Sequence, residues 1–149
     1  MRLVIQRVKS AKVSVGSYVA GSIGKGLFVL IGVGRGDTKG DVQVLAEKLS
    51  KLRIMPDKAG KMNLSVVDTK SQILVVSQFT LYADLKGGNR PSFINAKDPE
   101  AAKILYDYFI KVLNDKGIGV RSGSFGEYMK IITELDGPVT IIMDSKEIK

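Results

Sequence analysis

Two short polar strings hold the residues of this chain that are best placed to do chemistry. The first is Ser77-Gln78-Phe79-Thr80, which directly follows the apolar run 73–76. Hydroxyl, amide and aromatic groups therefore stand where a buried strand meets a loop, the usual position for functional groups on a rigid scaffold. The Thr80 hydroxyl is a candidate nucleophile that needs an adjacent base. An ordinary turn after a strand would show the same polar cluster.

The second string is Asp136-Gly137-Pro138-Val139-Thr140, near the C-terminus. Its Gly-Pro peptide is a tertiary amide, so the cis form is accessible. Gly-Pro also commonly opens a strand or a bend. Taken alone, neither string decides what the protein does.

The chain contains no Cys and no His among its 149 residues. This composition excludes disulfides, cysteine nucleophiles, thiolate metal sites, Ser-His-Asp triads and zinc sites with His ligands. Any hydrolysis has to rely on carboxylates, Lys, Tyr, backbone dipoles or groups that the substrate supplies.

Basic residues outnumber acidic ones by 23 to 15, which gives a net charge of +8. A basic surface favours polyanionic partners such as nucleic acids, although a net charge of about 2 to 8 also keeps small domains soluble. The longest apolar runs are too short to span a bilayer, and charge interrupts the N-terminus before a signal peptide could form. We therefore expect one cytoplasmic domain over 1–149, with no membrane association.

The hydrophobic pattern predicts mainly strands. Loose alternation predicts strands over 3–15 and 18–23, joined as a hairpin at Gly16-Ser17. The apolar runs 27–33 and 73–77 are predicted to be buried strands, the first covered on both faces. Three further extended segments are expected near 118–121, 127–134 and 138–143.

Two helices are predicted from apolar residues at three- and four-residue spacing. The first covers about 39–53, with Asp37 or Thr38 as its cap, and the second runs from Asp98-Pro99 to Gly117. Residues 55–61 are expected to form a polar loop. Because these helices do not alternate regularly with the strands, the predicted fold class is α+β and not a doubly wound sheet.

Three other patterns permit two interpretations each. The glycines of 32–36 could suggest a nucleotide-binding loop, but they fall at every second position and fit neither the dinucleotide fingerprint nor the P-loop, so a flexible strand-to-helix turn is the better interpretation. The loop Lys86-Gly87-Gly88-Asn89-Arg90 would suit either phosphate contacts or plain solvation. Phe125 and Met129, four residues apart, would ordinarily be core residues.

Motifs in matching order and spacing over nearly the whole chain resemble those of the D-aminoacyl-tRNA deacylase family. The strings that carry this resemblance are Met1-Arg2, Ile5-Gln6-Arg7-Val8, Gly24-Lys25-Gly26-Leu27, Gly36-Asp37-Thr38, Leu52-Arg53-Ile54, Gly60-Lys61-Met62-Asn63-Leu64-Ser65, the block 77–82, Arg90-Pro91-Ser92-Phe93, Leu105-Tyr106-Asp107-Tyr108-Phe109, Gly123, Phe125-Gly126, Met129 and Gly137-Pro138-Val139-Thr140.

The resemblance implies a single-domain, barrel-like mixed β-sheet with two main helices packed on it. It implies a homodimer that hydrolyses the ester bond of D-aminoacyl-tRNA, and of glycyl-tRNA in some contexts, while sparing L-aminoacyl-tRNA. The implied partners are the aminoacylated 3′ end of tRNA and a second copy of the chain. No cofactor, no metal and no DNA partner is expected.

The catalytic positions implied by the resemblance are Ser77, Gln78, Phe79 and Thr80. Since the chain has no His to activate Thr80, we favour backbone N–H groups around Phe79 and Thr80 as an oxyanion site. The neighbouring ribose 2′-OH is implied to assist with proton transfer, without a covalent acyl-enzyme.

The resemblance also assigns roles in substrate binding and selectivity. Gly137-Pro138 is implied to enter the partner subunit's pocket and to reject L side chains by steric clash, with Arg7 steadying that loop. Phe125 and Met129 are implied to lie near the pocket for the terminal adenosine of tRNA. Lys86 and Arg90 are then expected to contact substrate.

Two positions near the second string depart from the family pattern. Leu135 stands where Asn is common, and Ile141 stands where an aromatic residue is frequent. The main alternative function is a non-catalytic RNA-binding barrel, although no strand shows the closely spaced aromatic residues of a stacking platform. A second alternative is an amino-acid-sensing or structural dimer that keeps the fold without activity.

Overall fold

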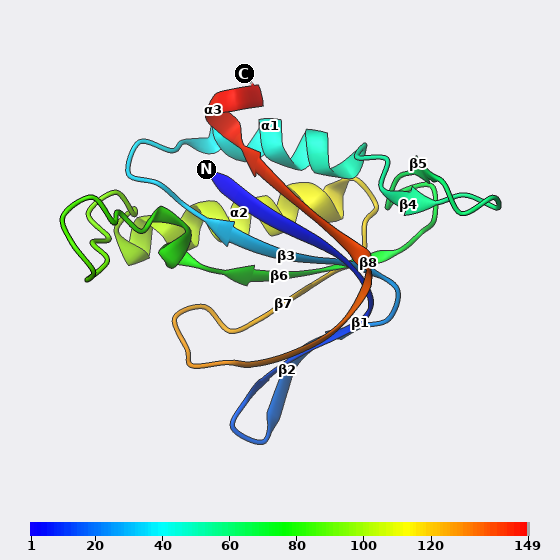
Figure 1. Ribbon diagram of the computed structural model, residues 1–149, viewed down its shortest axis with the longest axis horizontal. Coiled ribbons are helices and arrows are strands. Elements are labelled where there is room, and N and C mark those ends of the chain that lie inside the picture. Colours follow the sequence, from blue (N-terminus) through cyan, green and yellow to red (C-terminus); the bar gives the residue numbers. More distant parts are fainter. Residues whose placement is uncertain (149) are drawn as a thin grey trace.

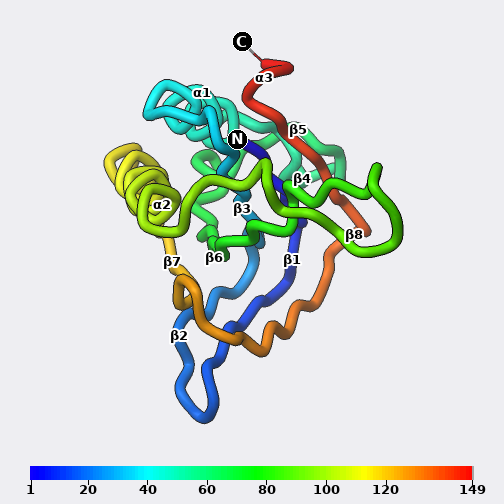
Figure 2. The backbone as a smooth tube through the Cα atoms, turned by 90° about the vertical axis from the view of Figure 1, so that its left-hand side faces the viewer, coloured from blue at the N-terminus to red at the C-terminus, as the bar shows by residue number. Residues whose placement is uncertain are grey.

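A computed structural model describes residues 1–148 of the chain. Its main sheet has six strands that curl around a common interior (Figure 1, Figure 2). The order is β2-β1-β3-β6-β7, and β8 pairs with the other side of β1. The pairs β3–β6 and β6–β7 are parallel, and the other pairs are antiparallel. The strands are β1 (Arg2–Val15), β2 (Tyr18–Ile23), β3 (Gly26–Gly32), β6 (Gln72–Ser77), β7 (Val120–Ser122) and β8 (Lys130–Asp144).

Helices α1 (Lys39–Ser50) and α2 (Pro99–Asp115) pack together along one face of the sheet (Figure 2). Thr38 caps α1, because its backbone N–H and its hydroxyl both donate to the Asp41 carboxylate, at 2.8 and 2.9 Å. Asp98 caps α2, with Pro99 in the first helical turn as expected. The predicted barrel-like α+β fold with two main helices is confirmed.

Strands β3 and β6 are buried on both faces, and their side chains point alternately into two separate hydrophobic cores. The odd-numbered residues Val29 and Val75 face the helices, whereas Phe28 and Leu74 face the interior of the curled sheet. Successive side chains of a strand point to opposite faces, so one apolar run serves both cores. The expectation that 27–33 is covered on both sides is confirmed, and this covered pair of strands is the rigid support for the first string.

Several predicted boundaries were wrong in detail. The extended segments 127–134 and 138–143 form one continuous strand, β8, because the long strand β1 pairs with both halves and only the register shifts between them. The loop expected over 55–61 contains β4 (Met55–Pro56), which pairs with β5 (Met62–Leu64). The α1 helix ends at Ser50 and not at residue 53.

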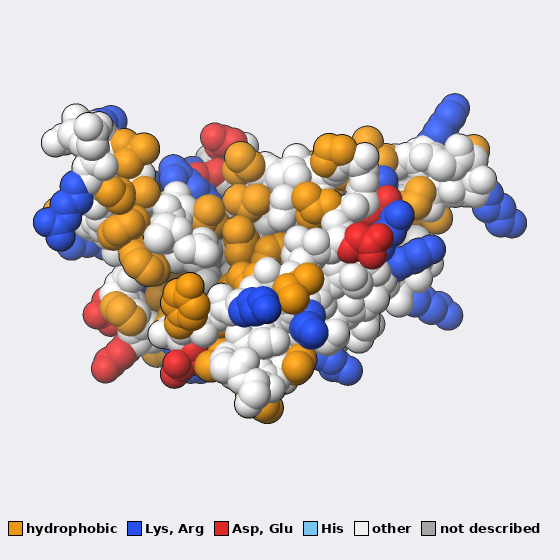
Figure 3. All heavy atoms as spheres, turned by 60° about the horizontal axis from the view of Figure 1, so that its bottom comes forward, with side chains coloured by type: hydrophobic (Ala, Val, Ile, Leu, Met, Phe, Trp, Pro, Cys, Tyr) orange, Lys and Arg blue, Asp and Glu red, His pale blue; other side chains and the backbone are white. Residues whose placement is uncertain are grey.

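Two short helices had no periodic signal long enough to predict them. The 3₁₀ helix η1 (Phe79–Tyr82) directly follows β6, and α3 (Ser145–Ile148) directly follows β8. Figure 1 shows that the segment holding η1 and the β4–β5 hairpin lie at opposite ends of the molecule. Basic side chains gather at both of these ends, with hydrophobic side chains between them (Figure 3).

Candidate active site

The first string is fixed at the end of β6 by the neighbouring strand β3. The Gln78 N–H donates to the Ile31 carbonyl at 2.8 Å, and the Leu81 N–H donates to the Gln78 carbonyl at 3.3 Å. The Phe79 and Thr80 N–H groups make no hydrogen bond to any acceptor within residues 1–148. Both belong to the first turn of η1, where a helix leaves its donors without internal partners. These two amides are therefore available to an incoming oxygen atom.

The side chains of the first string offer no activated nucleophile. Thr80 is exposed, and its hydroxyl accepts a hydrogen bond from the Gln78 amide. No carboxylate, Lys or Tyr of residues 1–148 is hydrogen-bonded to it. Phe79 is 55% exposed and packs edge-on against Phe93, with the ring centroids 4.8 Å apart. The site therefore combines free amides with an exposed aromatic wall.

The second string is held by Arg7 of β1. The Arg7 Nε donates to the Asp136 carbonyl at 3.1 Å and lies 3.4 Å from the Asp136 carboxylate, while Nη1 donates to the Ile54 carbonyl at 2.8 Å. Only 12% of the Arg7 side chain is exposed, so most of it is buried among these partners. Arg7 stands where the β1–β8 register shifts, opposite the bulged part of β8.

Gly137-Pro138 projects from this bulge into solvent, and its peptide bond is cis. Gly137 has φ +143°, a conformation that L side chains rarely adopt. A Cβ at this position would lie 2.6 Å from the Val139 backbone nitrogen. Glycine is therefore required here for both space and backbone conformation.

The two strings do not meet within one chain. Arg7 pairs with Leu27 of β3, which pairs with Ile73 at the start of β6, whereas Ser77 stands four residues further along that strand. Four residues of strand span about 13 Å, and the three strand spacings from β8 to β6 add about 14 Å across the sheet. Gly137-Pro138 thus lies far from the free amides of its own chain.

Phe125 and Met129 lie in the segment that leaves the sheet beside the first string. β6 and β7 are parallel, so Ser77 and the segment from Gly123 onward leave at the same edge. Phe125 packs against Tyr106, with the ring centroids 5.5 Å apart, on the core beneath the helices. Met129 packs on the other core. Both are only partly buried, and their contact with an adenosine stays a prediction.

Lys86 and Arg90 lie in the exposed loop between Asp84 and Ser92, which pair as an isolated bridge. The Lys86 N–H donates to the Asp84 carboxylate at 2.9 Å. Within residues 1–148, neither basic side chain forms an ion pair. Both are free to meet an anion, and this role also stays a prediction.

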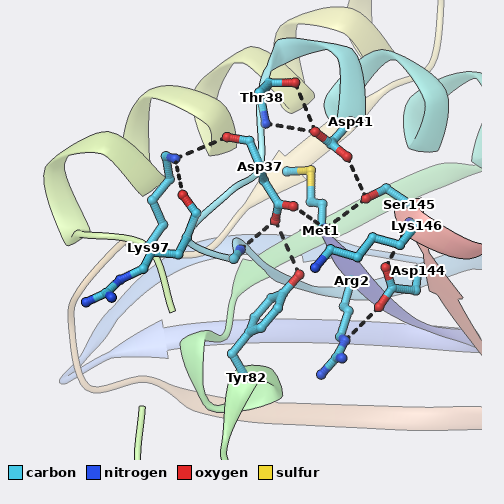
Figure 4. Close-up of polar contacts among 12 residues, drawn as sticks. Met1, Arg2, Asp37, Thr38, Asp41, Tyr82, Lys97, Asp144, Ser145 and Lys146 are labelled. Carbon is cyan, nitrogen blue, oxygen red and sulfur yellow. Dashed lines mark hydrogen bonds and ion pairs between the residues drawn. The ribbon is translucent and has the colours of Figure 1, made fainter. Parts of the chain in front are cut away.

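Sequence reasoning missed the polar network beneath η1, shown in Figure 4. The Asp37 carboxylate is buried and accepts hydrogen bonds from the Met1 α-ammonium at 2.7 Å, the Gly34 N–H at 2.5 Å and the Tyr82 hydroxyl at 3.3 Å. Burial, and then the nearby charge of Asp37, raise the pKa of Tyr82 well above its usual range. The sequence showed Asp37 as a possible helix cap and as part of the family pattern, but nothing local in the sequence indicates its contact with the N-terminal ammonium group.

Arg2 connects this network to η1. Its Nε donates to the Asp144 carboxylate at 2.8 Å, its Nη1 donates to the Leu81 carbonyl at 3.0 Å, and its guanidinium lies 4.7 Å from the centre of the Tyr82 ring. The end of η1 is therefore held by both a charged hydrogen bond and a cation–π contact. Arg2 is a positioning residue for the segment that carries the free amides.

No group of three or more Asp or Glu side chains in residues 1–148 comes together as a metal site. The same part of the chain contains no helix that is long and apolar enough to cross a membrane.

Comparison with known proteins decides the family. Residues 4–144 match the family model described as D-Tyr-tRNA(Tyr) deacylase. The D-aminoacyl-tRNA deacylase of Thermosipho melanesiensis is 52% identical over 149 residues, which cover 99% of each chain. The chain belongs to the D-aminoacyl-tRNA deacylase family. The predicted family and the assignment to an enzyme family are thereby confirmed.

Two solved structures share the deacylase fold seen here. One is described as the c-Myc DNA unwinding element binding protein, with a TM-score of 0.91, 38% identity and coverage of 97% of this chain and 98% of the other. The other, described as a probable eukaryotic D-amino acid tRNA deacylase, has a TM-score of 0.84 and 17% identity, and covers 95% of this chain and 97% of the other. The second likeness supports the fold alone.

Proposed function

We propose that this protein hydrolyses the ester bond between a D-amino acid and the 3′-terminal ribose of tRNA, and also acts on glycyl-tRNA. The observation that carries the proposal is the pair of unpartnered N–H groups of Phe79 and Thr80 at the end of β6. Aminoacylated tRNA is the substrate that the names of the relatives indicate. Because this substrate occurs in the cytoplasm, we expect the protein there.

In the proposed mechanism, backbone N–H groups stabilise the transition state of ester hydrolysis. The ester carbonyl oxygen lies against the Phe79 and Thr80 N–H groups, which stabilise the negative charge that develops when water attacks. Each such donor contributes about 2.7–4 kcal/mol to the barrier reduction. An aminoacyl ester is already activated, so orienting water beside the ribose 2′-OH suffices, and that hydroxyl relays the proton. Thr80 forms no acyl intermediate, since no base contacts it.

Selectivity in this proposal requires a second copy of the chain. D- and L-aminoacyl esters carry the same groups, so a steric clash discriminates between them better than added affinity. The Gly137-Pro138 main chain lies too far from the free amides of its own chain to line their pocket. The partner's Gly-Pro would therefore complete each site in a homodimer and occupy the space of an L side chain.

The test compares rates of deacylation for the D- and L-forms of one aminoacyl-tRNA. Gly137→Ala should displace the gate through its Cβ clash and its positive φ, so the ratio of D to L rates should change. Gly60→Ala is the matched control, because Gly60 also has positive φ (+78°) but open space around it. Light scattering should give the mass of a dimer for both variants. An unchanged D to L ratio in a folded Gly137→Ala dimer would mean that the gate is elsewhere.

A non-catalytic nucleic-acid-binding barrel remains the second candidate. It is favoured by the net charge of +8 and by the description of one structural relative as a DNA unwinding element binding protein. Binding of tRNA or duplex DNA without any ester hydrolysis would select this function. Hydrolysis of the D-ester would select the deacylase.

A further inference from the structure

A cleft of about 760 Å³ opens at the end of η1, where Tyr82 lines it and Phe79 and Thr80 do not. It lies between that helix, the turn after β3, the loop after η1 and the start of α3. Basic side chains from four separate segments line it: Arg2, Arg35, Lys86 and Lys146. Figure 4 shows Arg2, Lys146 and Tyr82 approaching this region from different elements.

Two acidic groups at the cleft, Asp37 and Asp144, are paired with cations, and among the described residues there only Asp84 keeps an unpaired charge. Asp37 is engaged by the Met1 ammonium, by Gly34 and by Tyr82, and Asp144 is engaged by Arg2. Asp84 lines the cleft and accepts the Lys86 backbone N–H. Positive charge therefore dominates the cleft.

The side chains of Arg35, Lys86 and Lys146 form no ion pair or hydrogen bond with any part of the described chain. A single exposed Lys is usually just solvated. Three unpaired cations that converge on one hollow concentrate positive potential and attract a polyanion.

Resting on the proposed function, we propose that this cleft binds the sugar-phosphate backbone of the acceptor strand next to the 3′-terminal nucleotide of tRNA. Helix η1 connects the free amides to the cleft. Its first residues, Phe79 and Thr80, present the free amides, and its last residue, Tyr82, lines the cleft, with Arg2 bound to the Leu81 carbonyl between them. A strand whose terminal ester lies at one end of this single turn passes into the cleft at the other end.

The open, basic character of the cleft fits a chain of phosphates better than one small anion. Exposed cations bind a single phosphate weakly, whereas each phosphate of a polyanion adds a contact and releases condensed counterions. Such contacts position the strand without reading its sequence. The cleft would thus hold the terminal nucleotide in register with the amides whatever the tRNA.

The test is equilibrium binding of uncharged tRNA to the double variant Arg35→Gln/Lys146→Gln over a series of salt concentrations. The slope of log affinity against log salt should fall by about two units, one for each lost phosphate contact. The double variant Lys58→Gln/Lys61→Gln is the matched control, because it removes the same charge from the β4–β5 turn at the other end of the molecule (Figure 1). Its slope should be that of the unmodified protein. An equal fall in both double variants, or in neither, would overturn the proposal.

A second experiment tests which part of the tRNA lies in the cleft. With tRNA that lacks its three terminal nucleotides, the difference between the Arg35→Gln/Lys146→Gln variant and the unmodified protein should disappear. If the difference persists, the cleft binds another part of the tRNA and the proposal is wrong. Both experiments measure binding, so they are independent of catalysis. Hydrolysis of a D-aminoacyl-adenosine ester by the unmodified protein tests the proposed function separately.

Discussion

Arg7 and Asp136 lie 129 residues apart in the chain and are joined through both the backbone and the side chain of the aspartate. The Arg7 Nε donates to the Asp136 carbonyl at 3.1 Å and lies 3.4 Å from its carboxylate, while Nη1 donates to the Ile54 carbonyl. One guanidinium therefore connects the residue before Gly137 to the segment after α1. The planar fork of Arg suits this task, whereas the single ammonium of Lys does not.

Arg7→Lys should reduce stability and loosen the Gly-Pro segment. Loss of the charged hydrogen bonds should lower the free energy of unfolding by roughly 1.5–3 kcal/mol, measured by urea denaturation. The ratio of D to L deacylation rates should change as well. The control is Lys9→Ala, because Lys9 and Glu134 form an exposed pair at 3.9 Å that contributes at most about 1 kcal/mol. Equal decreases in the free energy of unfolding for the two substitutions would contradict a special role for Arg7.

Thr80→Ala should retain most of the deacylase activity. The substitution removes a hydroxyl that accepts one hydrogen bond from Gln78, and a neutral hydrogen bond contributes about 0.5–1.5 kcal/mol, or at most about tenfold in rate. Removing a true nucleophile costs on the order of a millionfold. Single-turnover rates distinguish these outcomes. An aminoacyl adduct on Thr80, detected by mass spectrometry, would refute the water mechanism.

Activity should be unchanged in the presence of a chelator and without added metal. The chain contains no His or Cys, and residues 1–148 hold no cluster of carboxylates suited to an ion. The measurement uses a D-aminoacyl-adenosine ester, so that magnesium-dependent folding of tRNA does not interfere. Loss of activity that a divalent ion restores would contradict this prediction.

Asp37→Asn should destabilise the fold strongly, because the Met1 ammonium would lose its buried counter-ion. Both groups are almost fully buried, and breaking such a pair costs about 3–5 kcal/mol. Asp107→Asn is the control, since Asp107 and Lys103 form an exposed pair on α2 that contributes at most about 1 kcal/mol. Thermal unfolding of the two variants gives the comparison. A loss of less than about 1 kcal/mol for Asp37→Asn would show that the network is not structural.

Asp144 should make stability depend on pH in the acidic range. Burial raises the pKa of Asp144, but hydrogen bonds from Arg2 and Lys146, with the charges of the N-terminus and Arg2, outweigh it and leave the pKa below its usual value. The stabilisation is thus present above the unfolded-state pKa of about 3.9 and is lost as pH falls through the lower folded-state value. The stability difference between the unmodified protein and Asp144→Asn should therefore narrow below about pH 4. A stability difference that stays constant as the pH falls would contradict a stabilising role for the ionised Asp144 carboxylate.

Local patterns in the sequence determined the buried strands, both main helices and their caps. The uninterrupted apolar runs around Val29 and Val75 bury both strands, because successive side chains point to opposite faces. The helix caps are equally local, since Thr38 donates to the Asp41 carboxylate and Asp98 accepts from the Ala101 N–H. The position of Ser77–Thr80 at the end of a strand follows from the same short-range physics. Such features were predictable because each depends on neighbours in the chain.

Only the tertiary structure decided which distant groups meet. The pairing of both halves of β8 with β1, the bond from Arg7 to Asp136, and the burial of the Met1 ammonium against Asp37 depend on strand register and sheet curvature. No periodicity in the sequence encodes these contacts. The same register separates Gly137-Pro138 from the Phe79 and Thr80 amides by several strands. Only the folded sheet reveals this separation, which is the reason that the proposed gate has to come from a second chain.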